Sequence, residues 1–179
     1  MAVLNDKIQG ARSITKTNTT SIETFSSPND GPIGYVDTAG GIRFMAQAAG
    51  LKRATYQLPA GEQLPHVEIV YSHAKMDAVP IEDAISHGAK GIVLAGVGDG
   101  NTSKPALDAL EAAAKKGILI VRSTRVRSGF VTRNVEVDDD KNGFVVSEDL
   151  NPQKARVLAL IASGVTAPAE LQRAFTATL

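Results

Sequence analysis

From residue 66 onward, short apolar runs alternate with segments of helical periodicity. Strands are predicted at 67–71, 91–95 and 118–122, and helices at 80–87 and 103–116. The middle run, GIVLA, is apolar throughout, which is typical of a strand buried on both faces of a parallel sheet. Strands that alternate with helices across short joints predict an open α/β sheet with right-handed crossovers.

The end of the chain continues this pattern. A fourth apolar run at 144–147 predicts another strand. Asn151 followed by Pro152 predicts a helix start, because Asn caps helix N-termini and Pro fits the first helical position. A last helix is predicted after Pro168 from apolar residues at helical spacing, namely Leu171, Ala174 and Phe175. The predicted fold class is therefore α/β, with a small open parallel sheet flanked by helices.

The first 65 residues follow a different pattern. Val3 and Leu4 have the character of the end of a strand, and 15–20 is a polar loop. Two short apolar stretches within 31–44 flank a glycine turn, which predicts a β-hairpin. A strand and a hairpin cannot enclose a core. They are therefore predicted to be the tail end of a larger α/β domain.

These patterns divide the chain into three parts. Residues 1–45 are predicted to end an amino-terminal domain, 46–65 to form a connector, and 66–179 to form a complete carboxyl-terminal α/β domain. Because the first part lacks the sheet that should receive it, exposed apolar surface is expected there. We expect self-association, disorder of this first part, or pairing with a separate chain.

Composition narrows the function classes. The 19 basic and 19 acidic residues give zero formal net charge, which argues against a nucleic-acid partner. The absence of cysteine removes disulfide scaffolds, thiolate metal sites and cysteine nucleophiles. No apolar run approaches the ~20 residues that a transmembrane helix needs, so no membrane partner is expected. The start of the chain also lacks the pattern of a secretory signal.

The glycine-rich segment GVGDGN at 96–101 follows a predicted strand and precedes a predicted helix. A dinucleotide-binding turn would need glycine where Asn101 stands. The segment is more typical of a flexible turn, or of a site for another ligand at the carboxyl end of the strand. Arg122, on the third predicted strand, could be a second contact for such a ligand.

The remaining titratable groups give weaker signals. The three histidines lack metal-site spacing and are expected at the surface or at helix ends. The acidic run 136–140 lacks the spacing of a calcium loop and is expected to be a solvated turn, although Val137 separates Glu136 from the aspartates. Lys16 lies among hydroxyls in TKTNTT. A buried lysine can relay a proton for a hydroxyl nucleophile, but an exposed lysine is the commoner case.

Taken together and in this order, six segments resemble the bacterial type II L-asparaginases, including the glutaminase-asparaginases. They are LNDKIQGAR from Leu4, TKTNTT from Thr15, GPIG from Gly31, AGVGDGN from Ala95, VRS from Val121 and DLNPQKAR from Asp149. The resemblance covers the whole chain, which corresponds to the carboxyl-terminal half of that family. Residues 1–45 then resemble the end of the family's N-terminal domain, and 66–179 its Rossmann-like C-terminal domain.

The resemblance implies hydrolysis of L-asparagine, and to varying degrees L-glutamine, to the acid and ammonia without a cofactor or metal. In the family a threonine attacks the amide carbon, and a second threonine, an aspartate and a lysine handle protons. Lys16 matches the lysine, whereas the other three groups match nothing in this chain. Asn101 matches a polar residue that reaches the neighbouring subunit's substrate, and Glu136 matches a carboxylate near the substrate's amino group.

Because the matching nucleophile is absent, the resemblance implies that this chain alone has little or no amidase activity. It also implies a homotetramer of close dimers. A periplasmic location is expected from the family, or a cytoplasmic one if Met1 is the true start. Two other hypotheses stay open: a non-enzymatic small-ligand module built on 96–101 and Arg122, and a structural or inactive fragment.

Overall fold

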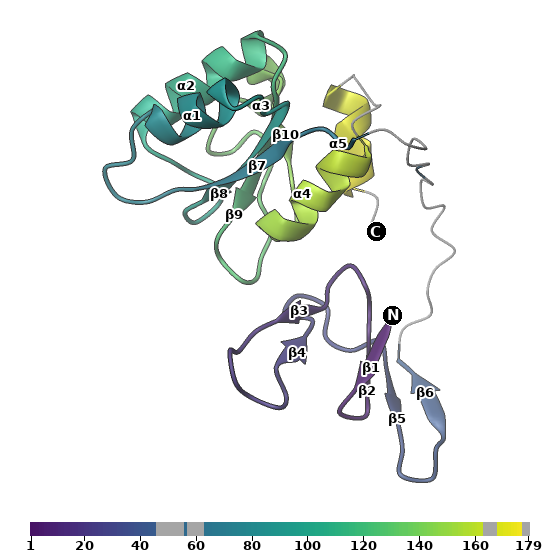
Figure 1. Ribbon diagram of the computed structural model, residues 1–179. Coiled ribbons are helices and arrows are strands. Elements are labelled where there is room, and N and C mark those ends of the chain that lie inside the picture. Colours follow the sequence, from purple (N-terminus) through teal and green to yellow (C-terminus); the bar gives the residue numbers. More distant parts are fainter. Residues whose placement is uncertain (46–55, 57–62, 163–167, 177–179) are drawn as a thin grey trace. The chain divides into compact units, whose positions relative to one another are not determined.

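The structure is a computed structural model that describes residues 1–45, 56, 63–162 and 168–176. The chain divides into two compact units (Figure 1). One comprises Met1–Lys52 with Arg127–Gly129, and the other Arg53–Val126 with Phe130–Leu179. The predicted connector 46–65 lies outside the described residues except for Tyr56 and 63–65.

The first unit is built from short antiparallel strands. The strands β1 (Ala2–Leu4), β2 (Lys7–Gln9), β5 (Gly34–Val36) and β6 (Ile42–Phe44) form one sheet in the order β1-β2-β5-β6. A separate ladder pairs β3 (Thr15–Lys16) with β4 (Phe25–Ser26). The predicted hairpin within 31–44 is confirmed as β5 and β6. Its loop is closed by the Asp37 carboxylate, which accepts hydrogen bonds from the backbone N–H groups of Ala39 and Gly41 at 3.0 and 2.7 Å.

Three strands of this unit, β2, β3 and β4, are not predicted from the sequence. The expectation of a polar loop at 15–20 is wrong for Thr15 and Lys16, which belong to β3. The β1–β2 hairpin turns through Asn5 and Asp6, with φ of 49° and 57°. A two-residue hairpin turn of this kind needs positive φ at both positions, which Asn and Asp tolerate. Strands of two or three residues are too short to show a period, so only the turn carried a signal.

Several large apolar side chains of the first unit are exposed. Val3, Ile42 and Phe44 have exposed fractions of 58%, 64% and 58%. Because exposed apolar side chains grouped on short strands favour association, the predicted self-association of this segment stays a prediction.

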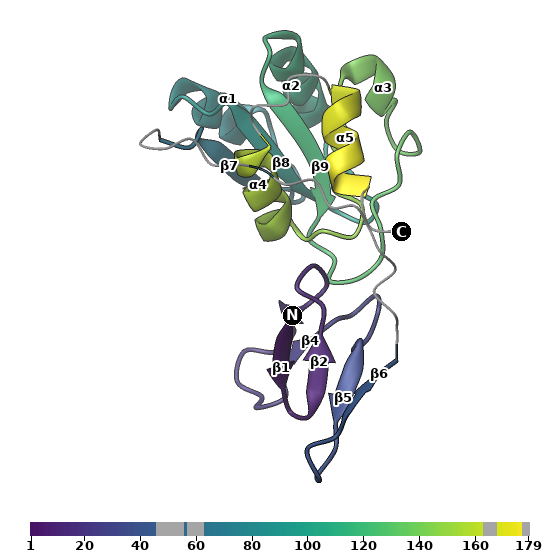
Figure 2. The same ribbon diagram turned by 90° about the vertical axis from the view of Figure 1, so that its right-hand side faces the viewer.

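The second unit contains a parallel four-stranded sheet, as predicted. The strands β7 (Val67–Tyr71), β8 (Gly91–Gly96), β9 (Leu119–Thr124) and β10 (Val145–Val146) are neighbours in chain order. Every residue of β8 is buried, which confirms the interpretation of the GIVLA run. Helices α1 (Val79–Ser86) and α2 (Lys104–Lys115) lie on one face of this sheet, and α4 (Pro152–Ile161) and α5 (Pro168–Thr176) on the other (Figure 2).

Successive side chains along a strand point to opposite faces of the sheet, so each strand contributes to the hydrophobic cores on both faces. Ile92 and Leu94 of β8 pack in the cluster that includes α1 and α2, whereas Val93 packs in the cluster that includes α4 and α5. The caps follow the sequence signals. Ser103 accepts a hydrogen bond from the Ala106 N–H at 3.3 Å, and Asn151 accepts one from the Lys154 N–H at 2.9 Å. Both predicted helix starts are therefore confirmed.

The edge strand β10 is completed by a side chain of α5. The Gln172 carboxamide accepts a hydrogen bond from the Val146 N–H at 2.8 Å and donates one to the Val146 carbonyl at 3.1 Å. Gln172 is only 8% exposed and Val146 1%. The amide thus takes the place of a neighbouring strand for these backbone groups, which would otherwise be buried without partners.

Candidate functional site

The glycine-rich segment leaves β8 at the carboxyl edge of the parallel sheet and turns straight back. Val97 and Asn101 exchange two backbone hydrogen bonds of 2.9 and 2.8 Å, which close the loop between them. Gly98 and Gly100 have φ of 50° and 75°, and these values fit glycine far better than a residue with a side chain. Asn101 is therefore presented on a short, closed loop at the edge where open α/β sheets bind ligands.

The side chain of Asn101 is held at both of its polar atoms. Its Nδ2 donates a hydrogen bond to Oε2 of Glu136 at 2.8 Å, and its Oδ1 accepts one from the Thr102 N–H at 2.8 Å. The structure thus brings together the two predicted substrate-binding residues, although 35 positions separate them in the sequence. Both residues are exposed. The pair offers solvent an oriented amide beside a carboxylate, which is an arrangement suited to a ligand ammonium group.

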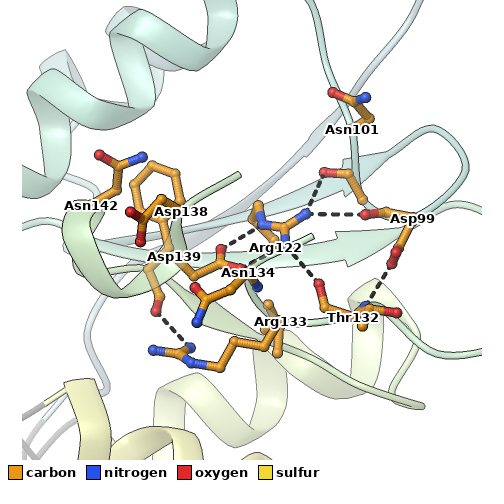
Figure 3. A network of polar contacts seen from close by, with 12 residues as sticks. Asp99, Asn101, Arg122, Thr132, Arg133, Asn134, Asp138, Asp139 and Asn142 are labelled. Atoms are coloured by element: carbon orange, nitrogen blue, oxygen red, sulfur yellow. Dashed lines mark hydrogen bonds and ion pairs between the residues drawn. The ribbon is translucent and has the colours of Figure 1, made fainter. Parts of the chain in front are cut away.

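Arg122, on β9, is buried, with none of its surface exposed. It forms a bidentate ion pair with Asp139, with Nε–Oδ1 and Nη2–Oδ2 distances of 2.6 and 2.8 Å. Its other donors reach the backbone carbonyls of three residues (Figure 3), which are Asp99 at 3.0 Å, Gly100 at 3.3 Å and Thr132 at 3.1 Å. All five N–H donors of the guanidinium are then used. Arg122 has none left for a ligand, so the hypothesis that it contacts one is wrong.

The acidic run 136–140 was expected to be a solvated turn, and this expectation is wrong for part of it. Asp139 is fully buried against Arg122, and its Oδ2 also accepts a hydrogen bond from the Asn134 N–H at 2.8 Å. Asp138 caps the short helix α3 (Asp139–Asn142) by accepting a hydrogen bond from the Lys141 N–H at 3.0 Å. An arginine inside an apolar strand was the available sequence signal, because a buried charge requires a partner of opposite charge.

A second arginine organises the outer part of the same loop. Arg133 contacts Asp140 with an N–O distance of 2.5 Å, and its Nη1 donates to the Phe144 carbonyl and to Gln172 Oε1 at 3.1 and 2.8 Å. Asn134 Nδ2 also donates to Asp140, at 2.7 Å. The hydrogen bonds from Arg133 and Asn134, together with the positive charge of Arg133, lower the pKa of Asp140 below its usual value.

Lys16 belongs to β3 of the first unit and is exposed. The next residue, Thr17, donates its N–H and its hydroxyl to the Thr24 carbonyl, at 2.7 and 2.9 Å. Asn18 Oδ1 accepts hydrogen bonds from the Thr20 and Ser21 N–H groups at 2.9 and 3.0 Å. The loop that follows Lys16 is thus shaped by its own hydroxyl and amide side chains.

The histidines are exposed, as expected, and His87 ends α1 with its ring against the Asp83 carbonyl at 2.7 Å. Within residues 1–45, 56, 63–162 and 168–176, no group of three or more histidine or acidic side chains is placed to hold a metal ion. None of the helices in these same ranges has the length and apolar character needed to span a membrane.

The parallel α/β unit defines the class of domain, and comparison with known families assigns that domain to a family. The family model of the Glutaminase/Asparaginase C-terminal domain matches residues 66–175, and that of the N-terminal asparaginase domain matches residues 1–49. The chain belongs to the glutaminase/asparaginase family, and the resemblance to type II L-asparaginases is confirmed.

Named relatives agree with this assignment. The chain is 43% identical to "L-asparaginase 2" of Escherichia coli, with 98% of this chain and 51% of that protein covered. It is 42% identical to "Probable L-asparaginase periplasmic" of Haemophilus influenzae, with coverages of 90% and 47%. Identity to "Glutaminase-asparaginase" of Pseudomonas fluorescens is 39%, with coverages of 98% and 49%. The chain thus spans about half the length of these relatives.

Proposed function

We propose that this chain is part of an amidohydrolase that releases ammonia from L-asparagine, and to varying degrees from L-glutamine. The observation that carries the proposal is the 2.8 Å hydrogen bond between Asn101 and Glu136 at the carboxyl edge of the sheet. The names of the relatives, L-asparaginase and glutaminase-asparaginase, supply the reaction.

The roles follow from the chemistry of the pair. The Glu136 carboxylate receives the α-ammonium of the substrate in a charge-assisted hydrogen bond. Asn101 keeps that carboxylate oriented, because its Nδ2 is already bound to Oε2 and its Oδ1 is tied to the backbone. This leaves Oε1 to face the ligand. Lys16 serves in proton transfer beside the threonine hydroxyls of its loop.

The family resemblance implies that the nucleophilic threonine lies in the part of the relatives that this chain does not match. Without an attacking hydroxyl there is no acyl-enzyme, so we propose that the chain alone has little or no activity. In the proposed enzyme, residues 1–45 complete an amino-terminal domain, and 46–65 connect it to the carboxyl-terminal domain, 66–179. The carboxyl-terminal domain supplies Asn101 and Glu136 to a neighbouring subunit within a homotetramer of close dimers. A periplasmic location is proposed because one relative is named periplasmic.

The experiment measures ammonia release from L-asparagine and L-glutamine by the purified chain. The same assay is repeated after refolding the chain with the part of the E. coli L-asparaginase 2 that it does not match. Activity is expected only in the mixture, and Glu136→Gln should raise KM because it removes the charge that holds the ammonium.

Asp108→Asn is the matched control. Asp108 is an exposed acidic residue of α2 that is paired with Lys104. Its substitution should leave the activity of the mixture unchanged. Equal KM values for Glu136→Gln and Asp108→Asn would refute the role given to Glu136. Activity of the chain alone, free of contaminating enzyme, would refute the proposal that this chain lacks the nucleophile.

A further inference from the structure

The loops that carry Asn101 and Glu136 are both attached to one buried side chain. Arg122 binds the carbonyls of Asp99 and Gly100, the two residues that precede Asn101. It also binds the carbonyl of Thr132 and the carboxylate of Asp139, on either side of Glu136. We name Arg122, Asp139 and these three carbonyls the Arg122 clamp.

Two further contacts tighten the same arrangement. Asp99 Oδ1 accepts a hydrogen bond from the Thr132 N–H at 2.6 Å, which joins the two loops directly (Figure 3). Asp139 Oδ2 accepts the Asn134 N–H, so the turn that leads to Glu136 is held as well. The space around the guanidinium is filled, because a Cβ on Gly100 would lie 3.1 Å from Arg122 Nη1 and 2.9 Å from Val131 Cγ1.

We propose that Arg122 is a positioning residue, whose clamp sets the distance and orientation between Asn101 and Glu136 without touching the substrate. That Asn101 and Glu136 bind substrate rests on the function proposed above. That Arg122 positions these two residues does not depend on it. A planar fork with five donors is needed, since lysine offers three donors at a single point and cannot reach a bidentate carboxylate and three carbonyls together.

The test uses NMR of the full 179-residue chain. In the unaltered protein, a nuclear Overhauser cross-peak is expected between the Asn101 Nδ2 protons and the Glu136 side chain. Arg122→Lys keeps a positive charge opposite Asp139. The double substitution Arg122→Met with Asp139→Leu removes both charges and avoids leaving one of them buried alone. The cross-peak should fall below half of its original intensity in both variants, while amide protection in β8 stays unchanged.

Arg133→Met is the matched control. Arg133 lies in the same loop and binds Asp140, the Phe144 carbonyl and Gln172, but it does not contact the Asn101 loop. Its substitution should leave the cross-peak intact. The proposal is overturned if the cross-peak persists in the folded double variant, if lysine restores it fully, or if Arg133→Met abolishes it equally. Loss of β8 protection together with the cross-peak also overturns it, because Arg122 would then only stabilise the sheet.

A second readout connects the clamp to catalysis. In the refolded mixture described above, Arg122→Lys should raise KM for L-asparagine about tenfold and change kcat by less than about twofold, as expected when binding of the ground state and of the transition state is weakened equally. If the mixture has no activity, the proposed function fails while the NMR result still decides on the clamp. If it is active and KM does not change, the link between the clamp and substrate binding is refuted.

Discussion

Gln172→Leu should destabilise the second unit, because it removes the amide that completes the edge of β10. Val146 would lose the partner of both its N–H and its carbonyl while staying buried. A buried backbone group without a partner costs about 1–3 kcal/mol, so two of them cost about 2–6 kcal/mol. The leucine returns about 1–2 kcal/mol through its apolar surface. The difference spans about 0–5 kcal/mol, and we expect a net loss near its middle, about 2–3 kcal/mol, in the free energy of unfolding.

The measurement is urea unfolding followed by circular dichroism, with a thermal scan beside it. For a chain of this size the loss corresponds to a fall in Tm of roughly 4–12 °C. Arg173→Leu is the control, because it places the same side chain at the next, exposed position of α5. It should change the free energy of unfolding by less than about 0.5 kcal/mol. A loss for Gln172→Leu within that limit would show that the Val146 groups find other partners, and the reasoning would fail.

Three further predictions concern single contacts. Because the pKa of Asp140 is lowered in the folded state, its contribution to stability is present above the ordinary carboxyl pKa and lost as pH falls through the lowered value. The stability difference between the unaltered chain and Asp140→Asn should therefore shrink on acidification, and a difference that grows would contradict this sign. Gly100→Ala should cost more than about 1 kcal/mol, because φ is +75° and the new Cβ would meet Val131 and Arg122, whereas Gly98→Ala, with open space around it, should cost less in the same unfolding assay. Asn151→Ala should lower the free energy of unfolding by about 1 kcal/mol through loss of the α4 cap, and Asn151→Ser should restore most of it.

The elements that could be predicted from the sequence are those with strong local signals. The unbroken GIVLA run gave β8, and Ser103 and Asn151 gave the starts of α2 and α4. The strands β2, β3 and β4 have only two or three residues, so their pairing depends on tertiary contacts rather than on a period.

The site divides in the same way. Asn101 and Glu136 were found through the family resemblance, since no local pattern links residues 35 positions apart. The pairing of Arg122 with Asp139 was missed because each was interpreted within its own segment, one as a ligand contact and the other as part of a solvated turn. When a buried ion pair joins distant segments, the sequence shows only the two charged residues and nothing that indicates their pairing.

The Arg122 clamp has a consequence for recombining this chain with its relatives. Loops at the edge of a parallel sheet are natural segments to exchange, but here 97–101 and 132–139 share one guanidinium. A chimaera with a breakpoint between these loops takes the carbonyls of Asp99 and Gly100 from one parent and the carboxylate of Asp139 from the other. Crossovers after residue 143, where α3 has ended, keep the clamp within one parent. The two loops thus behave as one inherited block, although the twelve-residue helix α2 and the strand β9 lie between them.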